Sequence, residues 1–272
     1  MNYNGSNYNE WVNYEYDSWA SELNKILQDV ELFKNFKQNP QIKRMLGASD
    51  LYQPFLDRIK DKDFPWKEIE IIDSIGNPPF LFDVNGFKIS GITLRYLYYA
   101  DKICKELINY DPYLKFNFVE IGGGYGGFAS ILLYLLENKK FPIVCSYSIF
   151  DIEDVQCFQN EYLNYICNLI FKDGRIKNSF ELFCFPEFSE NFQFVDVPDY
   201  LVSFYALGEF PKELKHQYIH KLVSQVPHGF IIWNPHFEPD NESVDLILKY
   251  HPNATVQQED PLTAQYNLEI KW

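Results

Sequence analysis

The sequence predicts an α/β fold of the Rossmann-like kind, with a mostly parallel sheet, an antiparallel C-terminal hairpin and an N-terminal helical extension. Three observations predict it. From residue 116 onwards, strand and helix patterns alternate, which is typical of a parallel sheet with helices on both faces. A glycine-rich turn at residues 122–127 joins the first of these strands to the first helix. Residues 266–272 then alternate apolar and polar side chains, as a strand does.

The N-terminal region, residues 1–110, is expected to be mainly helical and either to cover the substrate site or to form a dimer contact. Apolar residues at helical spacing predict three helices, over 11–36, 42–59 and 93–110. Pro40 is expected to end the first helix. The pair Asn85-Gly86 predicts a tight hairpin turn within residues 82–89.

Residues 111–272 are predicted to form the cofactor-binding domain. Strands are expected at 116–121, 143–150, 180–185, 199–205 and 229–233, and helices at 126–138, 153–170, 211–225 and 240–250. Ligands of such sheets bind at the carboxyl ends of the strands. The residues that follow each strand are therefore the first candidates for a functional site.

The run from Val119 to Phe128 reads Val-Glu-Ile-Gly-Gly-Gly-Tyr-Gly-Gly-Phe. Glycine lets the backbone adopt positive φ and approach a ligand closely, and the helix that follows offers free N–H groups. Two templates fit. Gly122, Gly124 and Gly127 match the dinucleotide fingerprint G-x-G-x-x-G. Gly122, Gly124 and Gly126 after Glu120 match E-x-G-x-G-x-G, the first motif of class I S-adenosylmethionine (SAM) methyltransferases.

The acid at Glu120 favours SAM, because a carboxylate beside the turn would repel a pyrophosphate but tolerates the sulfonium and ammonium groups of SAM. The predicted terminal hairpin favours SAM as well. Two alternatives stay open: an NAD-dependent sugar oxidoreductase or epimerase, and a non-catalytic partner subunit with a SAM-binding fold. The first lacks a clear Tyr-x-x-x-Lys pair downstream of the turn, and the intact glycine motif disfavours the second.

Polar residues after the later strands are candidate site residues. Asp151 can accept hydrogen bonds from both ribose hydroxyls of a nucleoside, or can cap the next helix. Glu209 can act as a general base, or can interact with a helix dipole. His236 can deprotonate a hydroxyl, or can be a loop histidine without a role. Tyr205 completes the catalytic candidates and can also stack on a sugar ring.

Composition excludes several classes of function. The net charge of −14 argues against nucleic-acid partners and an anionic membrane surface. The N-terminal residues do not form a signal peptide and no apolar run reaches membrane-spanning length, so a cytoplasmic location is expected. The five cysteines contain no C-x-x-C pair and are expected to be free thiols. His216 and His220 are expected on a solvated helix face, without a bound metal.

Three blocks together resemble a known family: 120–127, 149–155 and Ser-Phe-Tyr-Ala-Leu-Gly-Glu at 203–209. They are similar to the sugar O-methyltransferases of surface-glycan gene clusters. The first two also resemble the SAM-binding Gly-Gly-Gly-x-Gly and Phe-Asp-Leu-Pro motifs of plant small-molecule O-methyltransferases, although Ile152-Glu153 stands where that pattern has Leu-Pro. The resemblance covers roughly residues 85–272.

The resemblance implies methyl transfer from SAM to a hydroxyl of a sugar, a glycan or a nucleotide-sugar. It implies a cofactor site made by Glu120, Gly122, Gly123, Gly124, Tyr125, Gly126, Asp151, Ile152 and Ser203. The expected partners are a small-molecule or glycan substrate and, as an open option, a second copy of the chain.

Overall fold

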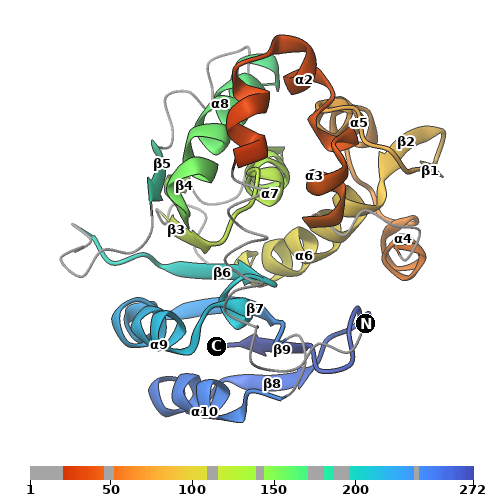
Figure 1. Ribbon diagram of the computed structural model, residues 1–272. Coiled ribbons are helices and arrows are strands. Elements are labelled where there is room, and N and C mark those ends of the chain that lie inside the picture. Colours follow the sequence, from red (N-terminus) through yellow and green to blue (C-terminus); the bar gives the residue numbers. More distant parts are fainter. Residues whose placement is uncertain are drawn as a thin grey trace, which may run out of the picture.

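The computed structural model describes residues 21–45, 52–108, 116–138, 144–170, 181–186, 196–235 and 239–272. Within these ranges the chain forms a seven-stranded sheet with the strand order β5-β4-β3-β6-β7-β9-β8, flanked by helices (Figure 1). The strands are β3 (Phe116–Ile121), β4 (Val144–Asp151), β5 (Glu181–Pro186), β6 (Tyr200–Phe204), β7 (His228–Trp233), β8 (Thr255–Gln258) and β9 (Leu268–Lys271).

The sheet is parallel except at one edge. The strands from β5 to β7 pair in parallel, whereas β9 pairs antiparallel with both β7 and β8. The strand β9 therefore lies between two strands that precede it in the chain. The predicted fold class, a mostly parallel Rossmann-like sheet that ends in an antiparallel hairpin, is confirmed by this order.

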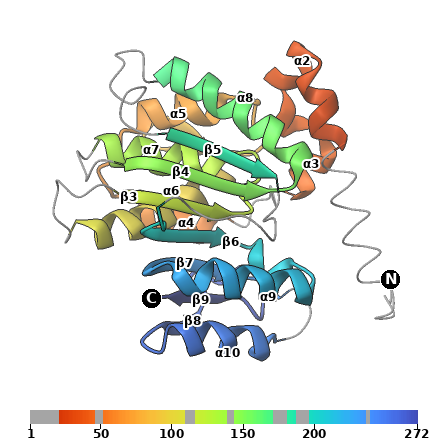
Figure 2. The same ribbon diagram turned by 90° about the vertical axis from the view of Figure 1, so that its left-hand side faces the viewer.

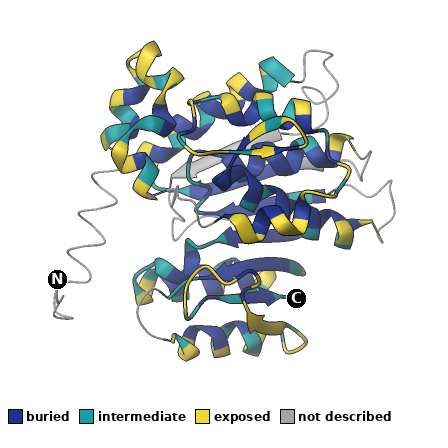
Figure 3. Ribbon diagram, turned by 90° about the vertical axis from the view of Figure 1, so that its right-hand side faces the viewer, coloured by how far each residue is buried: buried dark blue, intermediate teal, exposed yellow. Residues whose placement is uncertain are grey.

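Two layers of helices cover the sheet because side chains alternate along each strand. Phe118 stacks on Tyr147 with ring centroids 5.8 Å apart, in the core beneath α6, α7 and α8. Val119 and Ile121 point the other way, toward α9 and α10. Figure 2 shows α9 and α10 beside the C-terminal half of the sheet, and Figure 3 shows the strands mostly buried and the outer helix surfaces exposed. The helix bounds are Gly91–Leu107 (α6), Gly127–Asn138 (α7), Glu153–Ile170 (α8), Lys212–Lys221 (α9) and Asn241–Tyr250 (α10).

The N-terminal region is helical, but its boundaries differ from those predicted. Besides α6, its described elements include α2 (Val30–Lys34), η1 (Phe36–Gln38), α3 (Pro40–Met45), α4 (Gln53–Ile59), α5 (Trp66–Ser74), β1 (Leu81–Val84) and β2 (Phe87–Ser90). Pro40 begins α3 instead of ending a helix, because the Asn39 side chain accepts hydrogen bonds from the Gln41 and Ile42 amides. The predicted hairpin is confirmed, since Asn85 and Gly86 both have positive φ.

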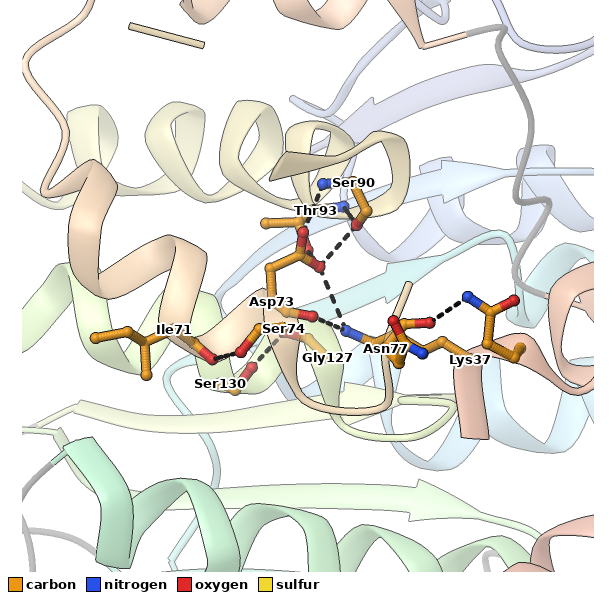
Figure 4. A network of polar contacts seen from close by, with 10 residues as sticks. Lys37, Ile71, Asp73, Ser74, Asn77, Ser90, Thr93, Gly127 and Ser130 are labelled. Carbon is orange, nitrogen blue, oxygen red and sulfur yellow. Dashed lines mark hydrogen bonds and ion pairs between the residues drawn. The ribbon is translucent and has the colours of Figure 1, made fainter. Parts of the chain in front are cut away.

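A buried polar network holds the segments of this region together (Figure 4). Lys37 Nζ donates to the Asp73 carbonyl at 2.8 Å and lies 3.3 Å from Asp73 Oδ1. The Asp73 carboxylate also accepts from the Ser90 amide and hydroxyl and from the Thr93 hydroxyl, at 2.5–2.8 Å. Burial lowers the pKa of Lys37, and its ammonium lies 5.3 Å from the ring of Tyr125 in the glycine turn. The N-terminal region thus packs directly against that turn.

None of the described helices combines the length and the apolar composition that a membrane-spanning helix requires.

Candidate functional site

The glycine turn follows β3, and contacts on the sides of both neighbouring strands fix its backbone. The Gly122 amide donates to the Phe150 carbonyl of β4 at 2.8 Å, and a Cβ at Gly122 would collide with the side chain of Ala206, beyond β6. Gly122 and Gly124 have φ of 72° and 56°, which glycine adopts without strain. A Cβ at Gly124 would meet nothing within 4 Å, so the turn leaves its open side at that residue.

Asp151, the last residue of β4, faces this open side. Its Oδ2 accepts a hydrogen bond from the Gly124 amide at 3.0 Å, and its Oδ1 accepts from the Ile152 amide at 2.9 Å. Neither donor belongs to the first turn of α8, and the bond from Gly124 ties the carboxylate to the glycine turn. Burial raises the pKa of Asp151 to about 7, although the hydrogen bonds act in the opposite direction.

Gln159 on α8 is a site residue that sequence reasoning missed. Its Nε2 donates to the Gly124 carbonyl at 2.7 Å and to Asp151 Oδ2 at 2.9 Å. Its Oε1 is buried and has no hydrogen-bond partner among the described residues. A buried acceptor of this kind is costly unless a ligand or water supplies a donor. The signal in the sequence is one amide on the apolar face of α8, beside Val155, Phe158 and Tyr162.

Glu120 lies beneath the turn rather than on its open side. Its side chain is 2% exposed, and its Oε2 accepts a hydrogen bond from the Tyr147 hydroxyl at 2.9 Å. Burial raises the pKa of Glu120 to about 8; the Tyr147 bond lowers it, and the Asp151 charge raises it further. A Cβ at Gly123 would lie 3.3 Å from Glu120 Cδ, so the carboxyl is packed against the turn.

Tyr125 and Ser203 support the turn. The Tyr125 ring is buried between Phe36 and Tyr162, with centroids 5.2 and 5.0 Å away. The Ser203 hydroxyl donates to the Ile121 carbonyl at 3.0 Å and accepts from the Leu207 amide at 3.2 Å. Both side chains make their contacts within the protein, so the structure places them beneath and beside the glycine turn.

Tyr205 follows β6 and belongs to a cluster of phenols and charges. It adopts φ of 66°, a conformation that is uncommon outside glycine and that concentrates at functional sites. Its hydroxyl donates to Glu259, as does the Tyr99 hydroxyl at 2.6 Å, and the two hydroxyls lie 3.1 Å apart. The Arg95 guanidinium lies 4.5 Å from the centre of the Tyr205 ring. Burial raises the pKa of Tyr205.

Glu259 is the second site residue that the sequence did not reveal. It lies between β8 and β9 and is 2% exposed. Its Oε1 accepts from the two tyrosines, while its Oε2 accepts from the Thr263 amide and hydroxyl and from Asn267, at 2.6–3.0 Å. Five donors thus occupy the two oxygens of this carboxylate. Glu259 therefore acts here as an anchor for Tyr99 and Tyr205.

Glu209 lies further along the sheet edge. Glu209 ends a short 3₁₀ turn after β6, η2 (Leu207–Glu209), and its Oε1 accepts from Asn234 Nδ2 at 2.7 Å. Asn234 directly follows β7, so this bond joins the carboxyl ends of β6 and β7. His236 lies outside the described residues.

His216 and His220 both contact α10. His216 Nε2 is 3.3 Å from the Ser243 hydroxyl, and His220 Nδ1 is 2.6 Å from the Tyr250 hydroxyl. Among the described residues, no three His, Cys, Asp or Glu side chains gather in a way that would hold a metal ion.

No protein-family model matches the sequence, and no curated protein matches it. Several solved structures resemble part of the fold. An O-methyltransferase family protein from Burkholderia thailandensis shares 12% identity over 64% of this chain and 56% of its own, with a TM-score of 0.41. The mitomycin 7-O-methyltransferase shares 14% identity over 66% of this chain and 54% of its own, with a TM-score of 0.39. The chain thus spans just over half the length of these two proteins.

A third likeness covers more of the chain. The magnesium protoporphyrin IX methyltransferase from Synechocystis, solved with bound S-adenosylhomocysteine (SAH), shares 11% identity over 85% of this chain and 97% of its own, with a TM-score of 0.45. All three similar proteins are methyltransferases by name, and the acceptors in their names differ.

Proposed function

We propose that this protein is a SAM-dependent O-methyltransferase that acts on a hydroxyl of a sugar, a glycan or a nucleotide-sugar. The observation that carries the proposal is the contact between Asp151 and the Gly124 amide, at the one side of the glycine turn where an added Cβ would find open space. A carboxylate held beside an open turn can bind the ribose of a nucleoside.

The residues around the turn fit SAM. Asp151 would accept hydrogen bonds from the ribose hydroxyls, and the orphaned Oε1 of Gln159 would accept another donor of the ligand. The Asp151 carboxylate, in its ionised form, disfavours a pyrophosphate and tolerates the cationic methionine part of SAM. The roles of Gly122, Gly123, Gly126 and Ile152 as cofactor contacts belong to the same proposal. When bound, SAM supplies an electrophilic methyl group on its sulfonium.

The chain must position the acceptor hydroxyl and take up its proton. Glu209 is the proposed general base, because it lies where the ends of β6 and β7 meet. His236 is the second candidate for this role. The Tyr205 hydroxyl donates a hydrogen bond to Glu259. Its phenolic oxygen therefore keeps the capacity to accept a hydrogen bond from the hydroxyl of the substrate. Alignment of the hydroxyl oxygen with the methyl group supplies much of the acceleration.

The choice of a sugar acceptor rests on the three sequence blocks that resemble the sugar O-methyltransferases and on the aromatic residues near the end of β6. The net charge of −14 disfavours nucleic acid as the acceptor. A small molecule or glycan is therefore the proposed partner. We also propose that the N-terminal region forms a homodimer contact.

The proposed function is tested by calorimetric titration with SAH, followed by a transfer assay with isotope-labelled SAM and a panel of sugars and nucleotide-sugars. We expect SAH to bind wild-type protein and to bind Asp151→Ala at least about tenfold more weakly, because the variant loses charge-assisted hydrogen bonds. Asp154→Ala, on the first turn of α8, is the matched control. Binding of NADH without binding of SAH would move the protein to the oxidoreductases. SAH binding without transfer to any acceptor would favour a partner subunit.

A further inference from the structure

Arg95 on α6 is a cation held among aromatic rings. Its guanidinium lies 4.5 Å from the centre of the Tyr205 ring, 5.5 Å from that of Tyr52 and 5.9 Å from that of Tyr96. Rings on several sides restrict the orientation of the guanidinium plane and are themselves favourable contacts for it. The side chain is thus held in place before any ligand binds.

One of the rings that surround Arg95 packs against the glycine turn. A Cβ at Gly127 would lie 2.7 Å from Tyr96 Cε2, which places the Tyr96 ring directly against the end of the turn. Tyr205 is followed by Ala206, whose side chain fills the space beside Gly122. Arg95 therefore lies between the glycine turn and the carboxyl end of β6.

The strand order indicates which part of a bound ligand would lie next to Arg95. The sheet runs β4-β3-β6, so the turn that leaves β3 has Asp151 on its β4 side and Tyr205 on its β6 side. A nucleoside whose ribose is bound at Asp151 and whose substituent crosses the turn must extend toward β6. The far end of that substituent then lies beside Arg95.

In SAM the substituent is a methionine, which ends in a carboxylate and an ammonium group. An arginine presents a planar fork of N–H donors that matches a carboxylate in a bidentate way. We propose that Arg95 binds the carboxylate of the methionine part of the cofactor. This inference rests on the proposed function, and it assigns a binding role to a residue outside the motifs singled out in the sequence.

The test compares two ligands that differ in the amino-acid end of the substituent. SAH carries the ammonium and carboxylate groups, whereas 5′-methylthioadenosine has the same adenosine and thioether without either. For Arg95→Met we expect SAH to bind roughly 10- to 100-fold more weakly, while the affinity for 5′-methylthioadenosine stays within about twofold of wild type. Lys105→Met is the control, because it removes one positive charge from the exposed side of the same helix.

The outcomes separate the two proposals. Wild-type protein that binds neither ligand would end the proposed function itself. Wild-type protein that binds SAH, with an Arg95→Met variant that binds SAH equally well or loses both ligands equally, would overturn the role of Arg95 alone. Thermal unfolding checks that the variant is folded. If it is not, Arg95→Lys, which keeps the charge and loses the fork, should weaken SAH several-fold and leave 5′-methylthioadenosine unchanged; equal effects on both ligands would overturn the inference.

Discussion

The Asp151 carboxylate and the Gly124 amide are joined by a 3.0 Å hydrogen bond that spans 27 positions of the chain and fastens the end of β4 to the glycine turn. Gln159 binds both partners, since its amide donates to the Gly124 carbonyl and to Asp151. The three residues form one unit, so a change in any of them should affect ligand binding through the others.

The first prediction concerns the pH dependence of SAH binding. The pKa of Asp151 is raised to about 7, so the fraction of ionised carboxylate grows about tenfold between pH 6 and pH 8. The ionised form accepts hydrogen bonds from ribose hydroxyls better, and wild-type affinity should therefore rise by roughly that factor over this range. Calorimetry at several pH values measures it. Asp151→Asn should bind weakly with a much flatter pH profile, and a flat wild-type profile would contradict the assignment.

Gln159→Leu should weaken SAH binding by roughly 5- to 20-fold, because the variant loses the donor that orients Asp151 and the acceptor offered to the ligand. Its stability should change little, since the change also removes the orphaned Oε1. Titration and urea unfolding measure the two effects separately. Gln156→Leu on the same helix is the matched control. Unchanged SAH affinity in Gln159→Leu would show that this amide has no part in binding.

Glu120 should make the protein less stable at high pH. Its folded-state pKa of about 8 lies above its ordinary value of 4.5, so the folded state holds a proton that the unfolded state releases. The stabilisation is complete below about pH 4.5 and is lost as the pH rises toward 8. Glu120→Gln keeps an acceptor for Tyr147 and stays neutral. Between pH 5 and pH 9, wild type should lose roughly 4 kcal/mol of unfolding free energy relative to this variant. Urea unfolding at several pH values measures this difference. If the unfolding free energies of wild type and Glu120→Gln change with pH by the same amount, Glu120 does not hold a proton in the folded state.

Gly124→Ala should separate folding from binding. The substitution adds backbone strain of about 1 kcal/mol at φ 56° but meets no atom within 4 Å, so the variant should fold. The added methyl group would stand on the open side of the turn and should reduce SAH affinity by an order of magnitude or more. Gly86→Ala is the control, because it has positive φ and open space in the hairpin, far from the turn. Equal SAH affinity in the two variants would place the ligand elsewhere.

Replacing either partner of the buried Lys37–Asp73 pair should lower the unfolding free energy, and the loss should be larger for Asp73. Asp73→Ala leaves a buried ammonium without its counter-charge and should cost about 3–5 kcal/mol. Lys37→Met should cost less, because Asp73 keeps its donors on Ser90 and Thr93. Urea unfolding of both variants measures the difference. A larger loss in Lys37→Met would mean that Asp73 is not satisfied by those donors.

Much of the fold was readable from local patterns. The strand at 116–121 and the helix at 153–170 are found at those bounds, because apolar periodicity is strongest in segments that are buried on a regular sheet. Local patterns predict the helix boundaries of the N-terminal region less well. Pro40 opens a helix because Asn39 caps it, and the short helix α5 begins directly after Pro65, among prolines that obscure its apolar spacing.

Site residues can be predicted from the sequence only where they belong to a local pattern, such as the end of a strand. The glycine turn and Asp151 follow directly from strand ends. Glu259 meets Tyr99 across 160 positions, and Arg95 reaches the turn only through the packing of α6. Contacts of this range depend on strand order and helix packing, which a single sequence does not specify.

The position of β9 has a consequence for how the protein is made. β8 is synthesised first, yet it joins the sheet only through β9, which follows it in the chain. Until β9 docks, β7 keeps an open edge of unpaired amide and carbonyl groups, a surface prone to wrong pairing. The same docking brings Glu259 to Tyr99 and Tyr205. The docking of β9 therefore completes the pairing of β7 and sets the tyrosine anchor in place in the same step, and chaperones that shield open strand edges would find their target before that step.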